Sequence, residues 1–108
     1  MAVNEIFETE LPKRLTAKPE IAKDINAVIH FDITGEGGGA WTLDGTKTEG
    51  WITPGKNGES KLTVICAAPD FEKIVAKQMN AQMAAMSGKL KFKPMDMTLA
   101  MKLAKLMG

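Results

Sequence analysis

Apolar side chains occupy every second position in residues 26–34. Ala27, Ile29, Phe31 and Ile33 form one side of this alternation. A period of two is typical of a half-buried β-strand, because successive side chains of a strand point to opposite faces of the sheet. The segment is therefore predicted to be one strand of a sheet that is covered on one face.

Further strands are predicted later in the chain, at about residues 40–44, 47–53, 62–66 and 89–93. Asp44-Gly45 predicts a tight hairpin turn between the first two of these, because glycine adopts the positive φ that such turns require. In the last strand, lysines alternate with Leu90 and Phe92. This alternation is typical of an edge strand or of an exposed sheet face.

Helices are predicted before and after the strands. An amphipathic helix over residues 3–11 should end or kink at Pro12, and Pro19 opens a short second helix. After the strand at 62–66, the sequence places a helix start at Pro69, a helix cap at Asn80 and a cap for the last helix at Asp96. The predicted fold class is α+β. It consists of one domain over residues 1–108, in which helices cover a five-stranded, mainly antiparallel sheet.

The bulk composition narrows the class of protein. A chain of 108 residues can bury a core within one domain, and 44% hydrophobic with 25% charged residues is ordinary for a globular protein. No apolar run approaches the ~18 residues of a membrane span, and the N-terminus has no signal-peptide pattern. With one cysteine and no Ser-Lys-Leu address at the C-terminus, a cytoplasmic location is expected.

Seven of the eight methionines lie in the last third of the chain, which is also its basic part. Residues 70–108 carry seven lysines against three acidic residues, whereas residues 1–69 carry seven basic against ten acidic residues. Methionine is flexible and fills irregular spaces, so this concentration suggests helices that wall an apolar cavity. The same pattern also describes an ordinary core, and the lysines are most simply solvated faces.

No group of residues in the sequence predicts catalysis, a cofactor or a metal site. His30 and Cys66 are each the only residue of their type, and a metal site needs several ligands. His30 is interpreted as structural, since no nucleophile-elbow motif accompanies it. Gly35–Gly39 does not fit a phosphate or dinucleotide fingerprint, because a strand rather than a helix follows it. Nucleic-acid binding is not expected, since the net charge is +1 and no basic groove with interleaved aromatic residues is evident.

Two blocks of the sequence resemble the sterol carrier protein 2 family. The first block runs from Ile25 to Gly39 and is followed by Trp41. The second follows in the right order and at the right distance, and it comprises Asp70-Phe71, Met79-Asn80, Gly88-Lys89-Leu90-Lys91 and Leu99-Ala100-Met101-Lys102-Leu103. Together the blocks cover most of the chain from residue 25 onward. The chain is similar to single-domain, bacterial-type members, which also lack the targeting tripeptide of peroxisomal relatives.

The resemblance implies a non-enzymatic lipid carrier. The sheet and helices would enclose a hydrophobic tunnel for a fatty acid, a fatty acyl-CoA or a sterol-like lipid, with no cofactor. This lipid is the expected partner, and some lysines are candidates for transient contact with an anionic membrane surface or a CoA phosphate. By position in the family, the residues expected to line the tunnel are Phe71, Ile74, Val75, Met79, Met83, Met86, Leu90, Phe92, Met97, Leu99, Met101 and Leu103.

The sequence departs from the family pattern at three places. Lys77 stands where family members often have glycine, and Ala85 and Met86 stand near positions that are often aromatic. The loss of ring volume predicts a wider or more adaptable cavity. Residues 94–96 replace the glycine-containing turn that is usual before the last helix, near which the ligand is expected to enter.

Two other functions stay open at the level of sequence. The last helix is polar only at Thr98, Lys102 and Lys105, so its wide apolar face is also suited to docking another protein or a dimer mate. An enzyme that uses His30 is the third possibility. The sequence leaves the oligomeric state open.

Overall fold

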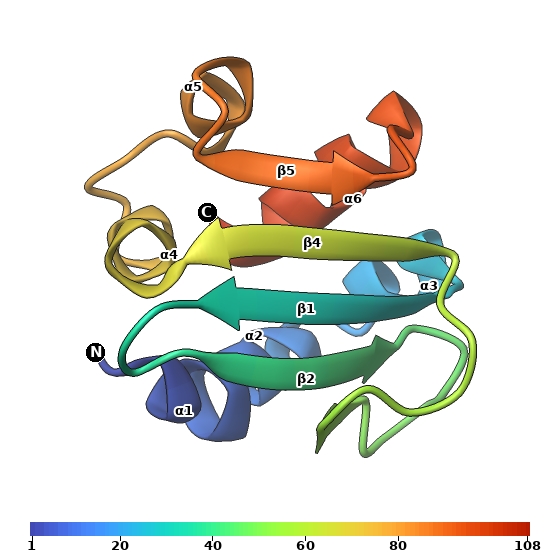
Figure 1. The fold of residues 1–108 in the computed structure, drawn as a ribbon. Helices are drawn as coiled ribbons and strands as arrows, with labels where there is room; N and C mark the ends of the chain where they lie inside the picture. The colour runs from blue at the N-terminus through green and yellow to red at the C-terminus, as the bar shows by residue number, and fades with distance from the viewer.

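The computed structural model describes residues 1–108 and contains a five-stranded sheet with helices α1, α2, α3 and α6 behind it (Figure 1). The strand order is β3-β2-β1-β4-β5, in which β1 and β4 are parallel and the other neighbours are antiparallel. This mixed α+β arrangement confirms the predicted fold class. The strands are β1 (Val28–Thr34), β2 (Gly39–Asp44), β3 (Ile52–Pro54), β4 (Leu62–Ala67) and β5 (Leu90–Lys93).

The two faces of the sheet are covered differently. The alternating residues Ile29, Phe31 and Ile33 of β1 are at most 3% exposed and belong to the main core. On the other face, the loop after β3 lies over β1 and β2. The Nε2–H of His30 donates to the Asn57 carbonyl at 3.1 Å, because a carbonyl oxygen can only accept. This contact accounts for the burial of His30 and fits the structural role predicted for it.

The N-terminal helix does not end at Pro12, but its regular α-helical hydrogen bonding is interrupted by a π-helical turn directly before this residue. Its successive parts are α1 (Val3–Glu5), the π-helical turn η1 (Ile6–Glu10) and α2 (Leu11–Ala17). The Leu11 N–H donates to the Ile6 carbonyl, five residues back. This wider turn immediately precedes Pro12, whose nitrogen has no hydrogen to donate. Pro19 then precedes α3 (Glu20–Ile25), as predicted.

The tight hairpin predicted at Asp44-Gly45 is absent. Leu43 of β2 pairs with Ile52 of β3, so a loop separates the strands, and β3 has only three residues in place of the predicted 47–53. Gly45 does not have a positive φ, and glycine is needed there because α3 packs closely against it. A Cβ on Gly45 would lie 2.8 Å from the Ala22 carbonyl oxygen of α3.

The predicted elements of the C-terminal third are confirmed. They are α4 (Ala68–Val75), α5 (Ala81–Met86), the edge strand β5 and α6 (Met97–Met107). The Asn80 side chain accepts from the Gln82 and Met83 N–H groups at 2.8 and 3.2 Å. Asp96 accepts from the Leu99 N–H at 3.0 Å. Both predicted caps therefore satisfy free N–H groups at the start of a helix.

An aromatic stack joins the helices to the sheet, and a single arginine joins three helices to one another. The Phe7 ring stacks on Trp41 and Phe71, with centroids 5.0 and 5.3 Å away, and meets Phe31 edge-on at 5.1 Å. Arg14 donates to the Leu106 and Met107 carbonyls of α6 at 3.0 and 2.8 Å, and to the Val75 carbonyl of α4 at 3.0 Å. The C-terminal ends of α4 and α6 are thereby held against α2.

Candidate functional site

Seven of the twelve side chains expected to line a tunnel lie together in the buried core. They come from α4, β5 and α6, and each is at most 7% exposed. All belong to one continuous apolar cluster on the helix-covered side of the sheet. The seven are Phe71, Ile74, Val75, Leu90, Phe92, Leu99 and Leu103.

Four predicted lining residues face solvent. Met83 and Met86 of α5 are 69% and 83% exposed, and Met97 and Met101 of α6 are each 64% exposed. The fifth remaining residue, Met79, is half-buried against the core cluster. In this conformation the face that the α5 methionines share is therefore on the outside. Contact of any of the twelve with a ligand remains a prediction.

The orientation of α5 follows from which of its side chains is small. Ala84 is the one buried residue of this helix, at 1% exposure, and the Ala84 carbonyl accepts the Lys89 N–H at 2.9 Å just before β5. A methyl group lets the helix approach β5 closely. The sequence of α5 contains no charged residue to mark its solvent side, so the periodicity of the methionines did not indicate which way they point.

Weakly buried elements bound the apolar layer on one side. α5 has little buried surface, since Ala84 is its one buried residue. In the first turn of α6, Met97 is exposed, whereas Leu99 and Ala100 are buried. The other end of α6 is fixed, since Leu103, Leu106 and Met107 are 0% exposed. α5 is therefore the part of this layer that can move at the lowest cost in free energy.

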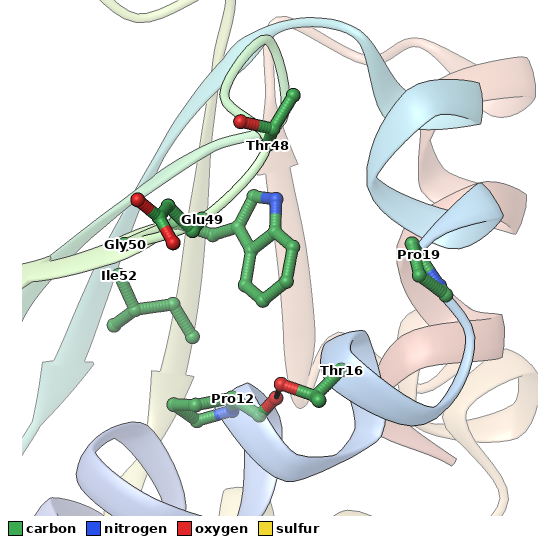
Figure 2. A pocket seen from close by; sticks show the side chains of 8 residues that line it. Pro12, Thr16, Pro19, Thr48, Glu49, Gly50 and Ile52 are labelled. Carbon is green, nitrogen blue, oxygen red and sulfur yellow. Dashed lines mark hydrogen bonds between the residues drawn. The ribbon is translucent and has the colours of Figure 1, made fainter.

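A hollow lies elsewhere, between α2 and the loop before β3. It is an open groove of about 500 Å³ lined by Pro12, Thr16, Pro19 and residues 48–52. Figure 2 shows Pro12 and Thr16 on one side of it and Glu49 and Ile52 on the other. A second hollow of about 330 Å³ lies beside Arg14, Lys18, Lys77 and Lys105. Neither hollow is lined by any of the twelve predicted residues.

The ionisable groups of the core and its surroundings have structural explanations. Burial, together with the nearby charge of Asp70, raises the pKa of the Cys66 thiol from 9.0 to about 11, so the thiolate form is disfavoured. The Lys102 ammonium donates to the Asp24 carbonyl at the end of α3, at 3.0 Å. No group of three or more His, Cys, Asp or Glu side chains is arranged to hold a metal ion.

A family comparison decides the classification. The model of the SCP-2 sterol transfer family matches residues 4–108. The chain belongs to this family. The resemblance carried by Ile25–Gly39 and by the second block is thereby confirmed.

No helix of the domain has the length and apolar character needed to cross a membrane.

Individual relatives agree with this classification. Hydroxysteroid dehydrogenase-like protein 2 of Bos taurus is 39% identical over 89 residues, which are 82% of this chain and 21% of that protein. The chain thus spans about a fifth of the length of such relatives. Sterol carrier protein 2 of Yarrowia lipolytica, in its apo form, has 26% identity and a TM-score of 0.74 over 94% of this chain and 86% of that one.

The fold is also shared with sterol carrier protein 2 like 2 of Aedes aegypti, solved in its palmitated form. That structure has 24% identity and a TM-score of 0.79, and the match covers 99% of this chain and 95% of that one. The likeness extends over the sheet and all the helices that cover it.

Proposed function

We propose that this domain binds a fatty acid, or another lipid with a long apolar chain such as a fatty acyl-CoA or a sterol-like molecule, and transfers it without catalysis. The family match over residues 4–108 carries the proposal. The palmitated form of the Aedes aegypti relative supports a fatty acid as the ligand class. The apolar layer between the sheet and α4, α5 and α6 is the proposed binding site, because it gathers seven predicted lining residues.

Binding requires a rearrangement, since side chains fill this layer in the structure. We infer that α5 and the first turn of α6 move away from β5 while Arg14 holds the far end of α6. The exposed methionines of these two helices then close over the alkyl chain, and their flexible thioethers adapt to its shape. Burying about 15 methylenes at ~0.8 kcal/mol each contributes roughly 12 kcal/mol. Displaced core contacts and lost ligand freedom offset part of this, which leaves micromolar to nanomolar affinity.

A photoreactive fatty acid with a diazirine near its methyl end tests the site. After irradiation and proteolysis, we expect mass spectrometry to find label on peptides from α4, β5 and α6. Label confined to Pro12–Pro19 and residues 48–52 would place the ligand in the groove of Figure 2 and overturn the proposed site.

Solution binding tests the function itself. We expect a fluorescent fatty acid to bind saturably and to be displaced by unlabelled palmitate. Native mass spectrometry of the purified protein should show co-purified lipid. If the protein binds no fluorescent fatty acid and carries no lipid, the carrier function is refuted.

Catalysis through His30 has no support in the geometry. His30 lies on the face of β1 opposite to Phe31, under the loop that contains Asn57, and it therefore points away from the apolar layer.

The apolar face of α6 offers little area on which another protein could dock. Leu99, Leu103 and Leu106 of that face are buried within the chain.

A further inference from the structure

Exposed methionines gather on one part of the chain. Of the six large hydrophobic residues that the structure exposes, five lie between residues 83 and 101, and the sixth is Met1. Their exposures range from 64% to 83%. Isolated exposed apolar residues are normal on protein surfaces, but a group within 19 residues calls for an explanation. The five are Met83, Met86, Met95, Met97 and Met101.

These methionines share one margin of the molecule with three lysines. β5 is an edge strand of the sheet, α5 lies just outside it, and the turn into α6 follows its end (Figure 1). Lys89, directly before this strand, and Lys91 and Lys93 on it are exposed, whereas Leu90 and Phe92 between them are buried. We call the margin that carries these five methionines and three lysines the Met–Lys edge. Its lysines point to the open face of β5, opposite to the buried Leu90 and Phe92.

The Met–Lys edge is strongly cationic. Between Lys73 and Gly108 the only acidic residue is Asp96, and its carboxylate caps the N-terminus of α6. The two side-chain ion pairs of the protein, Arg14–Glu10 and Lys56–Asp32, lie away from this edge. The charges of Lys89, Lys91 and Lys93 are therefore not neutralised by an ion pair within the chain.

This combination fits the surface of an anionic bilayer better than a second copy of the chain. A symmetric dimer that paired two β5 edges would bring the lysine row of one copy against the same row of the other, and like charges in facing strands are destabilising. At a bilayer, methionine side chains enter the acyl region while lysine ammonium groups stay among the phosphates. Methionine also adapts to a fluid surface that offers no fixed pocket.

We propose that the Met–Lys edge docks this protein on membranes that contain anionic phospholipid. Docking places α5 and the first turn of α6 against the bilayer, and these are the elements that must move to admit a lipid. The inference rests on the proposed function, and it locates the membrane contact on Lys89, Lys91 and Lys93. It does not use Lys102, which is bonded to the Asp24 carbonyl, or Lys105, which lines the hollow beside Arg14.

Vesicle flotation of the full chain tests the proposal. We expect binding to vesicles of phosphatidylcholine with 30 mol% phosphatidylglycerol, weak binding to pure phosphatidylcholine, and loss of binding with added salt. Each lysine near an anionic surface contributes about fivefold in partitioning. Reversing two charges in the K89E/K91E variant should therefore weaken binding by at least about 25-fold. The matched control K13E/K47E changes the net charge equally at exposed lysines away from β5, and it should retain most of the binding.

The methionine contribution is tested on α5, where both side chains are exposed and substitution leaves the core intact. The M83Q/M86Q variant keeps the side-chain length and helix propensity, and it should bind anionic vesicles at least about tenfold more weakly. M83L/M86L should bind as the wild type does. Circular dichroism establishes that each variant is folded before it is compared.

Specific results would overturn the inference. One is that K89E/K91E and K13E/K47E lose binding to anionic vesicles equally. Another is that M83Q/M86Q binds these vesicles as the wild type does. The third is that the wild type binds neutral and anionic vesicles equally. If the protein binds no vesicles but forms a stable dimer that the K89E/K91E substitutions weaken, the edge is an interface with a second copy of the chain instead. Binding of a fluorescent fatty acid without vesicles separates the two proposals. If it fails, the carrier function fails, whereas retained fatty-acid binding without vesicle docking refutes only the docking edge.

Discussion

Removing the Arg14 guanidinium should destabilise the fold more than any other single change to a charged side chain. Arg14 joins α2 to the last turns of α4 and α6 through three hydrogen bonds of 2.8–3.0 Å to the carbonyls of Val75, Leu106 and Met107. These carbonyls lie at helix C-terminal ends, where backbone acceptors lack helical partners and a cation interacts favourably with the helix dipole. Substitution with methionine keeps the apolar stem of the side chain and removes the donors.

The expected cost follows from these contacts. A hydrogen bond from a charged donor contributes about 1.5–3 kcal/mol when fully buried. The Arg14 side chain is 23% exposed, so about 1 kcal/mol for each of the three bonds is appropriate. The Glu10–Arg14 ion pair, at four residues' spacing on a helix, adds about 0.3–0.5 kcal/mol. The R14M variant should therefore lose about 2–4 kcal/mol of unfolding free energy, a large part of the 5–15 kcal/mol typical of a domain.

Urea denaturation at pH 7, followed by circular dichroism, measures this loss. The K13M variant is the matched control, because Lys13 precedes Arg14 on α2 and is exposed. It should change the unfolding free energy by less than about 0.5 kcal/mol. R14K should fall between the wild type and R14M, since an ammonium keeps the charge but cannot reach all three carbonyls. A loss in R14M below about 1 kcal/mol, or one equal to that in K13M, would show that the guanidinium does not hold these helices together.

Three further outcomes are expected from the same denaturation assay. Lys77 has a left-handed φ of +63°, so K77G should stabilise the fold by about 0.5–1 kcal/mol, and a loss of stability would show that its side chain makes a contact of greater value. G45A should cost about 1–3 kcal/mol, because its Cβ would meet the Ala22 carbonyl oxygen at 2.8 Å; an unchanged midpoint would mean that α3 shifts freely. Folding raises the Cys66 pKa from 9.0 to about 11, so the thiol ionises more readily in the unfolded chain. The stability that depends on the neutral thiol is therefore complete below pH 9 and is lost as the pH rises towards 11. The difference in unfolding free energy between the wild type and C66A should fall over this pH range, whereas a constant difference would refute the shift.

The sequence predicted best where a pattern and a cap agree. Alternation in β1 and β5 and the caps at Asn80 and Asp96 are all confirmed. Each of these signals is local, because the side chains concerned act on their own strand or on the first turn of their own helix. The order of the strands and the parallel pairing of β1 with β4 depend on distant contacts, and no local pattern specified them.

Local signals were misleading where a neighbouring element provides the contact. Gly45 resembles a turn residue in the sequence but accommodates α3. The methionines of α5 resemble a buried stripe, yet Ala84 makes the close contact with β5 and the larger side chains face outward. For the candidate site, the sequence predicted the elements α4, β5 and α6, and the structure gathers seven of the twelve expected side chains from them in one core cluster. The sequence did not determine which of their side chains face the interior.

The π-helical turn of η1 has a geometric consequence for the whole N-terminal helix. Val3, Phe7, Leu11 and Leu15 are spaced by four residues, and all are at most 2% exposed. In a regular α-helix of 3.6 residues per turn, each four-residue step overshoots a full turn by about 40°. Three such steps would rotate Leu15 by about 120° relative to Val3 and carry it towards solvent. The wider π-helical turn of η1 contains one extra residue, which cancels part of this rotation. The apolar side chains before and after Pro12 therefore stay on the side of the helix that faces the sheet.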